Sequence, residues 1–295
     1  MISRVTASSM TQTAMRHLQS NLTELARLQE QATSQRAFAA PSDDPAAAAT
    51  ALGLHAEQRR NDQYARNIDD GLAWVTTADS AITRSAGLLS RVRDLTVQGA
   101  NDGALDATAK EAIAVELEGI RDELLAQANT RLLGRSVFAG TSDTAAFAGN
   151  PTYAFSGSPD GEVMRRISET ASVRVDADGE AVFGTGAGSV FALVDNIIDD
   201  LRNGTNVGAR LNEIDDRRTA MLSAQGAVGA RQTQIERAKE AAVQNSVSLE
   251  SRRAAIEDVD SVEVLVRLQA QELVYRSALA VNARVLQPSL MDFLQ

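Results

Sequence analysis

Residues 261–287, "SVEVLVRLQAQELVYRSALAVNARVLQ", form a stretch without proline, and we predict a helix over about 259–287. On a helix, Val262, Val266 and Leu273 lie along one seam, and two further apolar seams lie on other sides. The second seam contains Leu265, Leu268, Tyr275, Leu279 and Leu286, and the third contains Val274, Val281 and Val285. An ordinary surface helix keeps one broad polar face, so this helix must bury most of its circumference.

The other end of the chain carries a helical pattern of nearly the same length, over residues 4–33. Its predicted heptad seam steps by four and three residues through Leu18, Leu22, Leu25, Gln29 and Ala32. Two matched helices at opposite chain ends can pair along their full length, but such a pair cannot cover three faces.

The uncovered faces leave two interpretations open. The C-terminal helix could be the central helix of this chain's own core, or neighbouring subunits could bury it. The matched lengths favour the second interpretation. The expected assembly interface comprises Leu18, Leu22, Leu25, Val262, Leu265, Val266, Leu268, Leu273, Tyr275, Leu279 and Leu286.

The rest of the chain is also patterned mainly as helix. Residues 45–100 are predicted to form one long helix or two abutting helices, and another helix begins near Thr108 in a capping-box pattern and runs to about Leu133. Helical pattern resumes near Ser189, stops at Asn203-Gly204 and continues over about 206–257. Hydrophobic residues make up 44% of the chain but aromatic residues only 4%, which is typical of thin, closely packed helices.

Glycine and phenylalanine concentrate in the middle of the chain, where we expect a compact insert with short strands. A hairpin is predicted there, with a strand over 173–175, a turn over 176–179 and a return strand at 182–183.

The predicted fold class is therefore mainly α: a long helical bundle or coiled coil formed by both chain ends, with a small β-containing central insert. The expected domains are a terminal helical pair (1–40 with 260–295), a long-helix bundle (41–140 with 189–259) and the insert (141–188).

The stretch "FAAPSDDPAAAATALGL", residues 38–54, contains two adjacent acids that could be read as metal ligands. Adjacent side chains on a helix point about 100° apart, which is poor geometry for one ion. Helix capping explains the stretch better: Asp44 suits the N-cap and Pro45 the first helical position. Pro41 keeps the preceding chain extended. We expect an inter-domain joint at Pro41, Asp44 and Pro45.

Several function classes are disfavoured. The net charge of −10 argues against a nucleic-acid partner, because phosphate binding needs a basic face. The chain has no cysteine, its histidines are His17 and His55, and no nucleotide-binding glycine motif is present. It shows neither a secretory signal nor an apolar run long enough for a membrane span. We expect no catalytic residue, cofactor or metal, and no membrane partner.

Four segments in order carry a family resemblance: "PSDDPAAAATAL" at 41–52, "NIDDGLAWVTTADSAI" at 67–82, "LLGRSVFAGT" at 132–141, and "EDVDSVEVLVRLQAQELVYRSALAVNARVLQPSLMDFLQ" at 257–295. Together they resemble the hook-associated protein 3 family, the hook–filament junction members of the flagellin superfamily. Two positions depart from the family pattern: Ser34-Gln35 replaces a common Gly-Lys pair, and Ser136-Val137 replaces a common aromatic.

The resemblance implies a structural adaptor that joins the bacterial flagellar hook to the flagellin filament. Implied partners are copies of itself, hook-associated protein 1, flagellin and an export chaperone. The implied location is extracellular, after export by the flagellar type III system without a cleaved signal. Two alternatives stay open, namely a flagellin-like filament subunit and a cytoplasmic coiled-coil scaffold.

Overall fold

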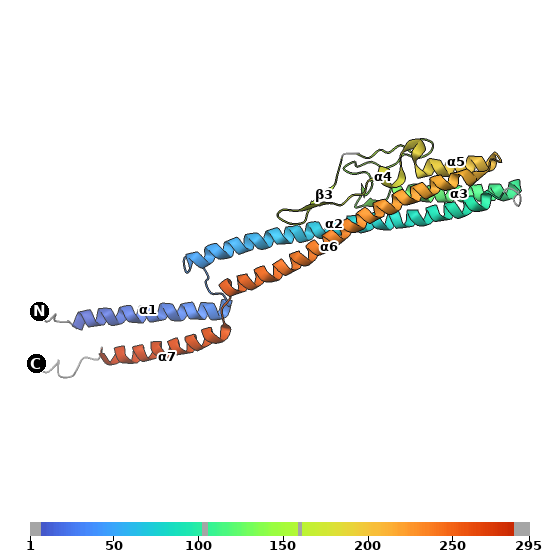
Figure 1. The fold of residues 1–295 in the computed structure, drawn as a ribbon. Coiled ribbons are helices and arrows are strands. Elements are labelled where there is room, and N and C mark those ends of the chain that lie inside the picture. The colour runs from blue at the N-terminus through green and yellow to red at the C-terminus, as the bar shows by residue number, and fades with distance from the viewer. Residues whose placement is uncertain (1–6, 102–105, 159–160, 286–295) are drawn as a thin grey trace, which may run out of the picture. The chain divides into compact units, whose positions relative to one another are not determined.

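The computed structural model describes residues 7–101, 106–158 and 161–285, and most of them are helical, as predicted (Figure 1). None of the helices within these ranges is long and apolar enough to span a bilayer. The helices are α1 (Ala7–Ser34), α2 (Pro45–Gly99), α3 (Ala107–Ala128), α4 (Gly179–Phe183), α5 (Val190–Arg202), α6 (Leu211–Glu257) and α7 (Ser261–Val285), with 3-10 turns η1 (Gly186–Gly188) and η2 (Val207–Arg210). The strands are β1 (Arg131–Leu132), β2 (Arg135–Ser136), β3 (Met164–Arg166) and β4 (Ser172–Arg174).

The chain forms two compact units. Unit 1 comprises residues 1–60 and 246–295, and unit 2 comprises residues 61–245. This division differs from the three parts expected above, because the insert shares one continuous apolar core with α2, α3, α5 and α6. The insert is therefore part of unit 2, and the first turns of α2 belong with the terminal helices.

The core of unit 2 is organised by a seven-residue repeat on its two long helices. On α2 the repeat places Asn61, Ile68, Val75, Ile82, Leu89 and Thr96 in the interior. On α6 it places Ile214, Met221, Val228, Ile235 and Ala242 there. A repeat of seven keeps one stripe of each helix facing its partner over many turns, as in coiled coils.

Polar contacts between α2 and α6 follow one antiparallel register through unit 2. Arg93 Nε donates to Asp215 Oδ1 at 3.0 Å, and Gln225 Nε2 donates to Thr83 Oγ1 at 2.8 Å. Each step back along α2 is matched by an equal step forward along α6. Inside the stripe, the side-chain amide of Asn61 donates a hydrogen bond to the carbonyl oxygen of Ala242 at 3.0 Å. This bond gives the buried amide the polar partner that it needs away from water.

An aromatic cluster fills the insert and joins it to α5. Phe147 packs edge-on against Phe183 and Phe191, with ring centroids 5.7 and 5.3 Å apart. Tyr153 stacks at a tilt on Phe191 and donates its hydroxyl to Asp195 on α5 at 2.6 Å. These rings supply the bulky packing that the alanine-rich helices lack.

The predicted hairpin is wrong in its second half. Strand β4 pairs with the earlier strand β3, in antiparallel register. Residues 179–183 form helix α4 because the Asp178 side chain accepts the N–H groups of Glu180 and Ala181 and caps the helix. Asp176 does not sit in a turn: its buried carboxylate accepts Val163 N–H and pairs with Arg174.

Other helix ends also show how local chemistry sets the boundaries. Asp106 rather than Thr108 caps α3, by accepting Ala109 N–H at 2.8 Å. Helix α5 ends at Asn203-Gly204 as predicted, and Gly204 has a φ of +73°, a conformation that suits glycine.

We predict that Ile82→Ala lowers the free energy of unfolding by about 2–5 kcal/mol, because it leaves a cavity in the fully buried stripe of unit 2. Urea titration followed by circular dichroism measures this loss. Leu222→Ala, at a 51% exposed position of α6, is the matched control and should change the free energy by less than about 0.5 kcal/mol. Equal effects of the two variants would contradict the buried stripe.

Candidate assembly surface

Helices α1 and α7 of unit 1 pack against each other over their length, as expected for the terminal pair (Figure 1). Leu28 and Val264 are buried between them, with 3% and 6% of their surface exposed. Gln271 Nε2 donates across the pair to the carbonyl oxygen of Asn21 at 3.3 Å. On α7 the half-buried positions that continue the seam are Leu268, Gln271, Tyr275, Ala278 and Asn282.

The seam predicted on α1 is wrong at two positions. Leu22 is 50% exposed and Gln29 is exposed as well. The seam instead runs through Leu18, Asn21, Leu25 and Leu28. Both choices step by four and three residues, so the spacing alone could not separate them, and the polar Asn21 made the true seam the less obvious one.

Most apolar side chains of α7 lie outside this seam. Val262 and Leu273 are 73% and 67% exposed, and five further residues are at least two-fifths exposed: Leu265, Val266, Val274, Leu279 and Val281. They lie on several sides of the helix, so α1 covers only one part of an all-round apolar surface. We call these seven residues the outer face of α7.

The structure thus divides the predicted interface residues into two groups. Leu18, Leu25, Leu268 and Tyr275 are half-buried along the α1–α7 seam, whereas Leu22, Val262, Leu265, Val266, Leu273 and Leu279 are exposed. Leu286 lies outside the described residues. Five residues of the second group belong to the outer face of α7 and the sixth, Leu22, lies on α1, and all six remain available to another chain.

The link between α1 and α2 is held by two adjacent caps in unit 1. Asp44 Oδ1 accepts the N–H groups of Ala46 and Ala47 at 3.1 and 2.9 Å, the hydrogen bonds of an N-cap, and α2 begins at Pro45. Asp43 turns the other way and accepts the N–H groups of Ala39 and Ala40. Those backbone hydrogen bonds hold the pKa of Asp43 below its usual value.

The same link is tied to the turn between α6 and α7. Ala37 N–H donates to the carbonyl oxygen of Glu257 at 2.7 Å, and Val259 N–H donates to that of Gln35 at 3.2 Å. The Glu257 carboxylate, 13% exposed, lies 2.6 Å from His55 Nε2 and 3.1 Å from Arg253. Burial raises the pKa of Glu257, but the bonds from Arg253 and His55 outweigh it, so its pKa is lowered. Sequence reasoning missed this tie, which joins residues far apart in the chain.

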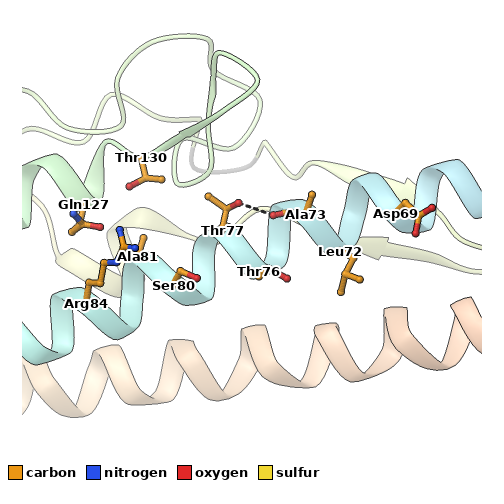
Figure 2. Close-up of a pocket in the computed structure, with 10 residues that line it drawn as sticks. All are labelled: Asp69, Leu72, Ala73, Thr76, Thr77, Ser80, Ala81, Arg84, Gln127 and Thr130. Atoms are coloured by element: carbon orange, nitrogen blue, oxygen red, sulfur yellow. Dashed lines mark hydrogen bonds between the residues drawn. The ribbon is translucent and has the colours of Figure 1, made fainter.

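Unit 2 carries a groove along one face of α2. It has a volume of about 540 Å³ and follows one face of α2 from Asp69 to Arg84, with Gln127 and Thr130 on its rim (Figure 2). Its hydroxyl groups have no acid or base partner within the groove, and Thr77 Oγ1 donates to its own helix at Ala73. Among the described residues no cluster of His, Asp or Glu is arranged to hold a metal ion.

Two family models match the chain, one at each end. The bacterial flagellin N-terminal helical region matches residues 5–143, and the bacterial flagellin C-terminal helical region matches residues 211–294. Both terminal helices and both long helices lie almost entirely within these matches, whereas most of the insert lies between them.

Some related sequences are named flagellin and others are named flagellar hook-associated protein 3. The flagellin of Bacillus subtilis is 25% identical over 260 residues, which is 83% of this chain and 84% of the relative. Flagellar hook-associated protein 3 of Salmonella typhimurium is 27% identical over 181 residues, which is 61% of this chain and 56% of the relative. This second alignment therefore spans little more than half of the relative's length.

A solved structure shares the fold. A Vibrio parahaemolyticus protein described as flagellar hook-associated superposes with a TM-score of 0.68 at 24% identity. The alignment covers 73% of this chain and 100% of that chain.

We predict that Asp44→Ala destabilises unit 1 by about 0.5–2 kcal/mol through the lost cap of α2. Thermal unfolding followed by circular dichroism measures the effect. Glu57→Ala removes an exposed carboxylate from the interior of the same helix and should leave stability nearly unchanged. An equally small effect of Asp44→Ala would show that the cap contributes nothing.

We also predict that Glu257→Gln lowers the melting temperature at pH 7, with the loss disappearing in acid. The pKa of Glu257 is lower in the folded chain, so its stabilisation is present above the usual value of 4.5 and is lost as the pH falls through the folded value. Melting curves from pH 7 to pH 3 for both chains measure this. Glu30→Gln, exposed on α1, serves as control; a pH-independent difference for Glu257→Gln would contradict the tie.

Proposed function

The chain belongs to the flagellin superfamily, and from this premise we propose that it is a structural adaptor joining the flagellar hook to the flagellin filament. A relative named flagellar hook-associated protein 3 and a fold shared with a solved hook-associated protein support the proposal. The superfamily consists of structural flagellar proteins, and the exposed apolar side chains of α7 suit a structural role.

The outer face of α7 carries the proposal. Seven large apolar side chains are exposed on several sides of one helix, and α1 covers a single seam. Exposed apolar surface of this extent on a soluble chain marks an interaction site. Neighbouring terminal helices of the same kind would bury it, so the helix pair would be completed in an assembly of subunits.

The proposed adaptor role also implies particular partners and a location for the chain. We infer that copies of the chain form a layer of a tubular polymer, with hook-associated protein 1 on one side and flagellin on the other. A contact that uses two different patches on each subunit suits such an open arrangement. We further infer extracellular location at the flagellum, type III export with a chaperone, and a joint at Pro41, Asp44 and Pro45 that connects α1 to α2 inside unit 1.

A flagellin-like filament subunit is the second candidate. The alignment with Bacillus subtilis flagellin favours it, since it covers most of both chains. The two candidates differ in the product of self-assembly, because a filament subunit polymerises without limit whereas an adaptor stops at a short layer. Long filaments formed by the purified chain alone would favour the second candidate.

Location in the cell tests the main proposal directly. Deleting the gene should leave hooks without filaments, and antibody labelling in electron microscopy should place the protein at the hook tip. A cytoplasmic coiled-coil scaffold would instead leave filaments intact and label the cell interior.

We predict that Leu273→Asp abolishes assembly while leaving the melting temperature of the monomer unchanged, because the side chain is 67% exposed in the single chain. Val264→Asp places a charge in the buried α1–α7 seam and should destabilise the pair itself. Gln269→Asp adds the same charge at an exposed polar position of α7 and is the control, which should change neither assembly nor the melting temperature. Sedimentation and filament attachment to isolated hooks are the readouts; normal attachment by Leu273→Asp would contradict the proposal.

A further inference from the structure

Five side chains near the start of α2 and the end of α6 form a closed ring of hydrogen bonds inside unit 1. His55 Nε2 lies 2.6 Å from Glu257 Oε1, and Glu257 Oε2 accepts from Arg253 at 3.1 Å. Arg253 in turn donates to both carboxylate oxygens of Glu250. Gln58 closes the ring, because its Nε2 donates to Glu250 at 3.0 Å and its Oε1 lies 3.2 Å from His55 Nδ1. We call this set of five side chains the His55 ring.

The directions of these hydrogen bonds fix the charge of His55. A carboxylate only accepts, so Gln58 must turn its NH2 group toward Glu250, and its carbonyl oxygen is left facing His55 Nδ1. The other nitrogen, Nε2, faces the carboxylate of Glu257, which is also an acceptor. Neutral imidazole has one N–H donor, whereas the imidazolium ion has two. The ring can therefore close only when both nitrogens of His55 carry a proton.

The charges around His55 also favour the imidazolium ion. Arg253 pairs with three carboxylates at once, namely those of Glu250, Glu257 and Asp258. The hydrogen bond from Arg253 lowers the pKa of Glu250, so this carboxylate is charged at neutral pH. One guanidinium leaves the cluster with an excess of negative charge, and the imidazolium supplies a second cation. The other charged side chains beside the ring are exposed: Arg36, Glu57, Arg59 and Arg252.

Glu257 connects the His55 ring to the link between α1 and α2. Its carboxylate belongs to the ring, while its carbonyl oxygen accepts Ala37 N–H at 2.7 Å. Beside it, Val259 N–H donates to the carbonyl oxygen of Gln35, which has a φ of +57°. A glutamine is strained at positive φ and keeps this conformation only where the surrounding contacts impose it. The backbone pairing of the link thus depends on the position of Glu257, which the ring fixes.

We propose that the His55 ring is a proton-operated latch, in which the imidazolium ion of His55 holds Glu257 and so keeps the α1–α2 link paired with the turn before α7. Loss of one proton would leave a lone pair of the imidazole facing an acceptor oxygen, and the latch would open. Because the closed latch needs the proton, its stabilisation is present at lower pH and is lost as the pH rises. The inference concerns unit 1 alone and does not rest on the proposed adaptor function.

Amide hydrogen exchange in the full-length chain tests the latch. The backbone N–H groups of Ala37 and Val259 report on the closed state, and exchange in unit 2 is the reference for overall folding. NMR of the imidazole nitrogens should show two protons on His55 at pH 6 and identify the higher pH at which one is lost. At that pH, protection of Ala37 and Val259 should be about tenfold lower than at pH 6, after correction for intrinsic exchange, as expected for one hydrogen bond to a charged group.

Two variants separate the latch from a general effect of pH. His55→Gln keeps an amide donor but no titratable charge, so protection at Ala37 and Val259 should be low at both pH values. His17→Gln removes the other histidine, which is exposed on α1, and should keep the full pH dependence. A single ring proton on His55 at pH 6, protection that stays unchanged when His55 loses its proton, or the same pH dependence in His55→Gln would each overturn the proposal.

Discussion

The architecture of this protein depends on the matched seven-residue repeat of α2 and α6. Two helices of this length stay in contact only if their apolar positions recur at the same interval, since any mismatch would rotate one stripe into solvent. In unit 2 both stripes are buried, as at Ile82 on α2 and Met221 on α6, and the Asn61 amide donates a hydrogen bond to the carbonyl oxygen of Ala242 on the opposite helix. This long interior gives α3, α5 and the insert a surface to pack on.

The terminal pair follows the same packing rule with a different outcome. Between α1 and α7 the buried seam is narrow, with Leu28 and Val264 at its centre, and the outer face of α7 is left without a partner. A two-helix pair has too little surface to enclose a helix that is apolar on every side. The proposed function would resolve this imbalance, because neighbouring chains would bury the outer face of α7.

Electrostatic contacts serve mainly to position the backbone. Asp43 and Asp44 each cap a different stretch of the α1–α2 link, and Glu257 ties that link to the turn before α7. Adjacent acids of this kind could be mistaken for a metal site in the sequence. Their hydrogen bonds to backbone N–H groups show instead that Asp44 caps the start of α2 and that Asp43 holds the turn before it.

The sequence by itself determined the helical class, the paired chain ends, the helix stop at Asn203-Gly204 and the excess of apolar faces on α7. These depend on local propensity and on periodicity, which are written along the chain. The tertiary structure alone decided the seam through Asn21 and Leu28, the pairing of β4 with β3, and the tie of Glu257 to His55 and Ala37. Each of these contacts depends on a partner that is distant in sequence. The local sequence around each residue was compatible with more than one such arrangement.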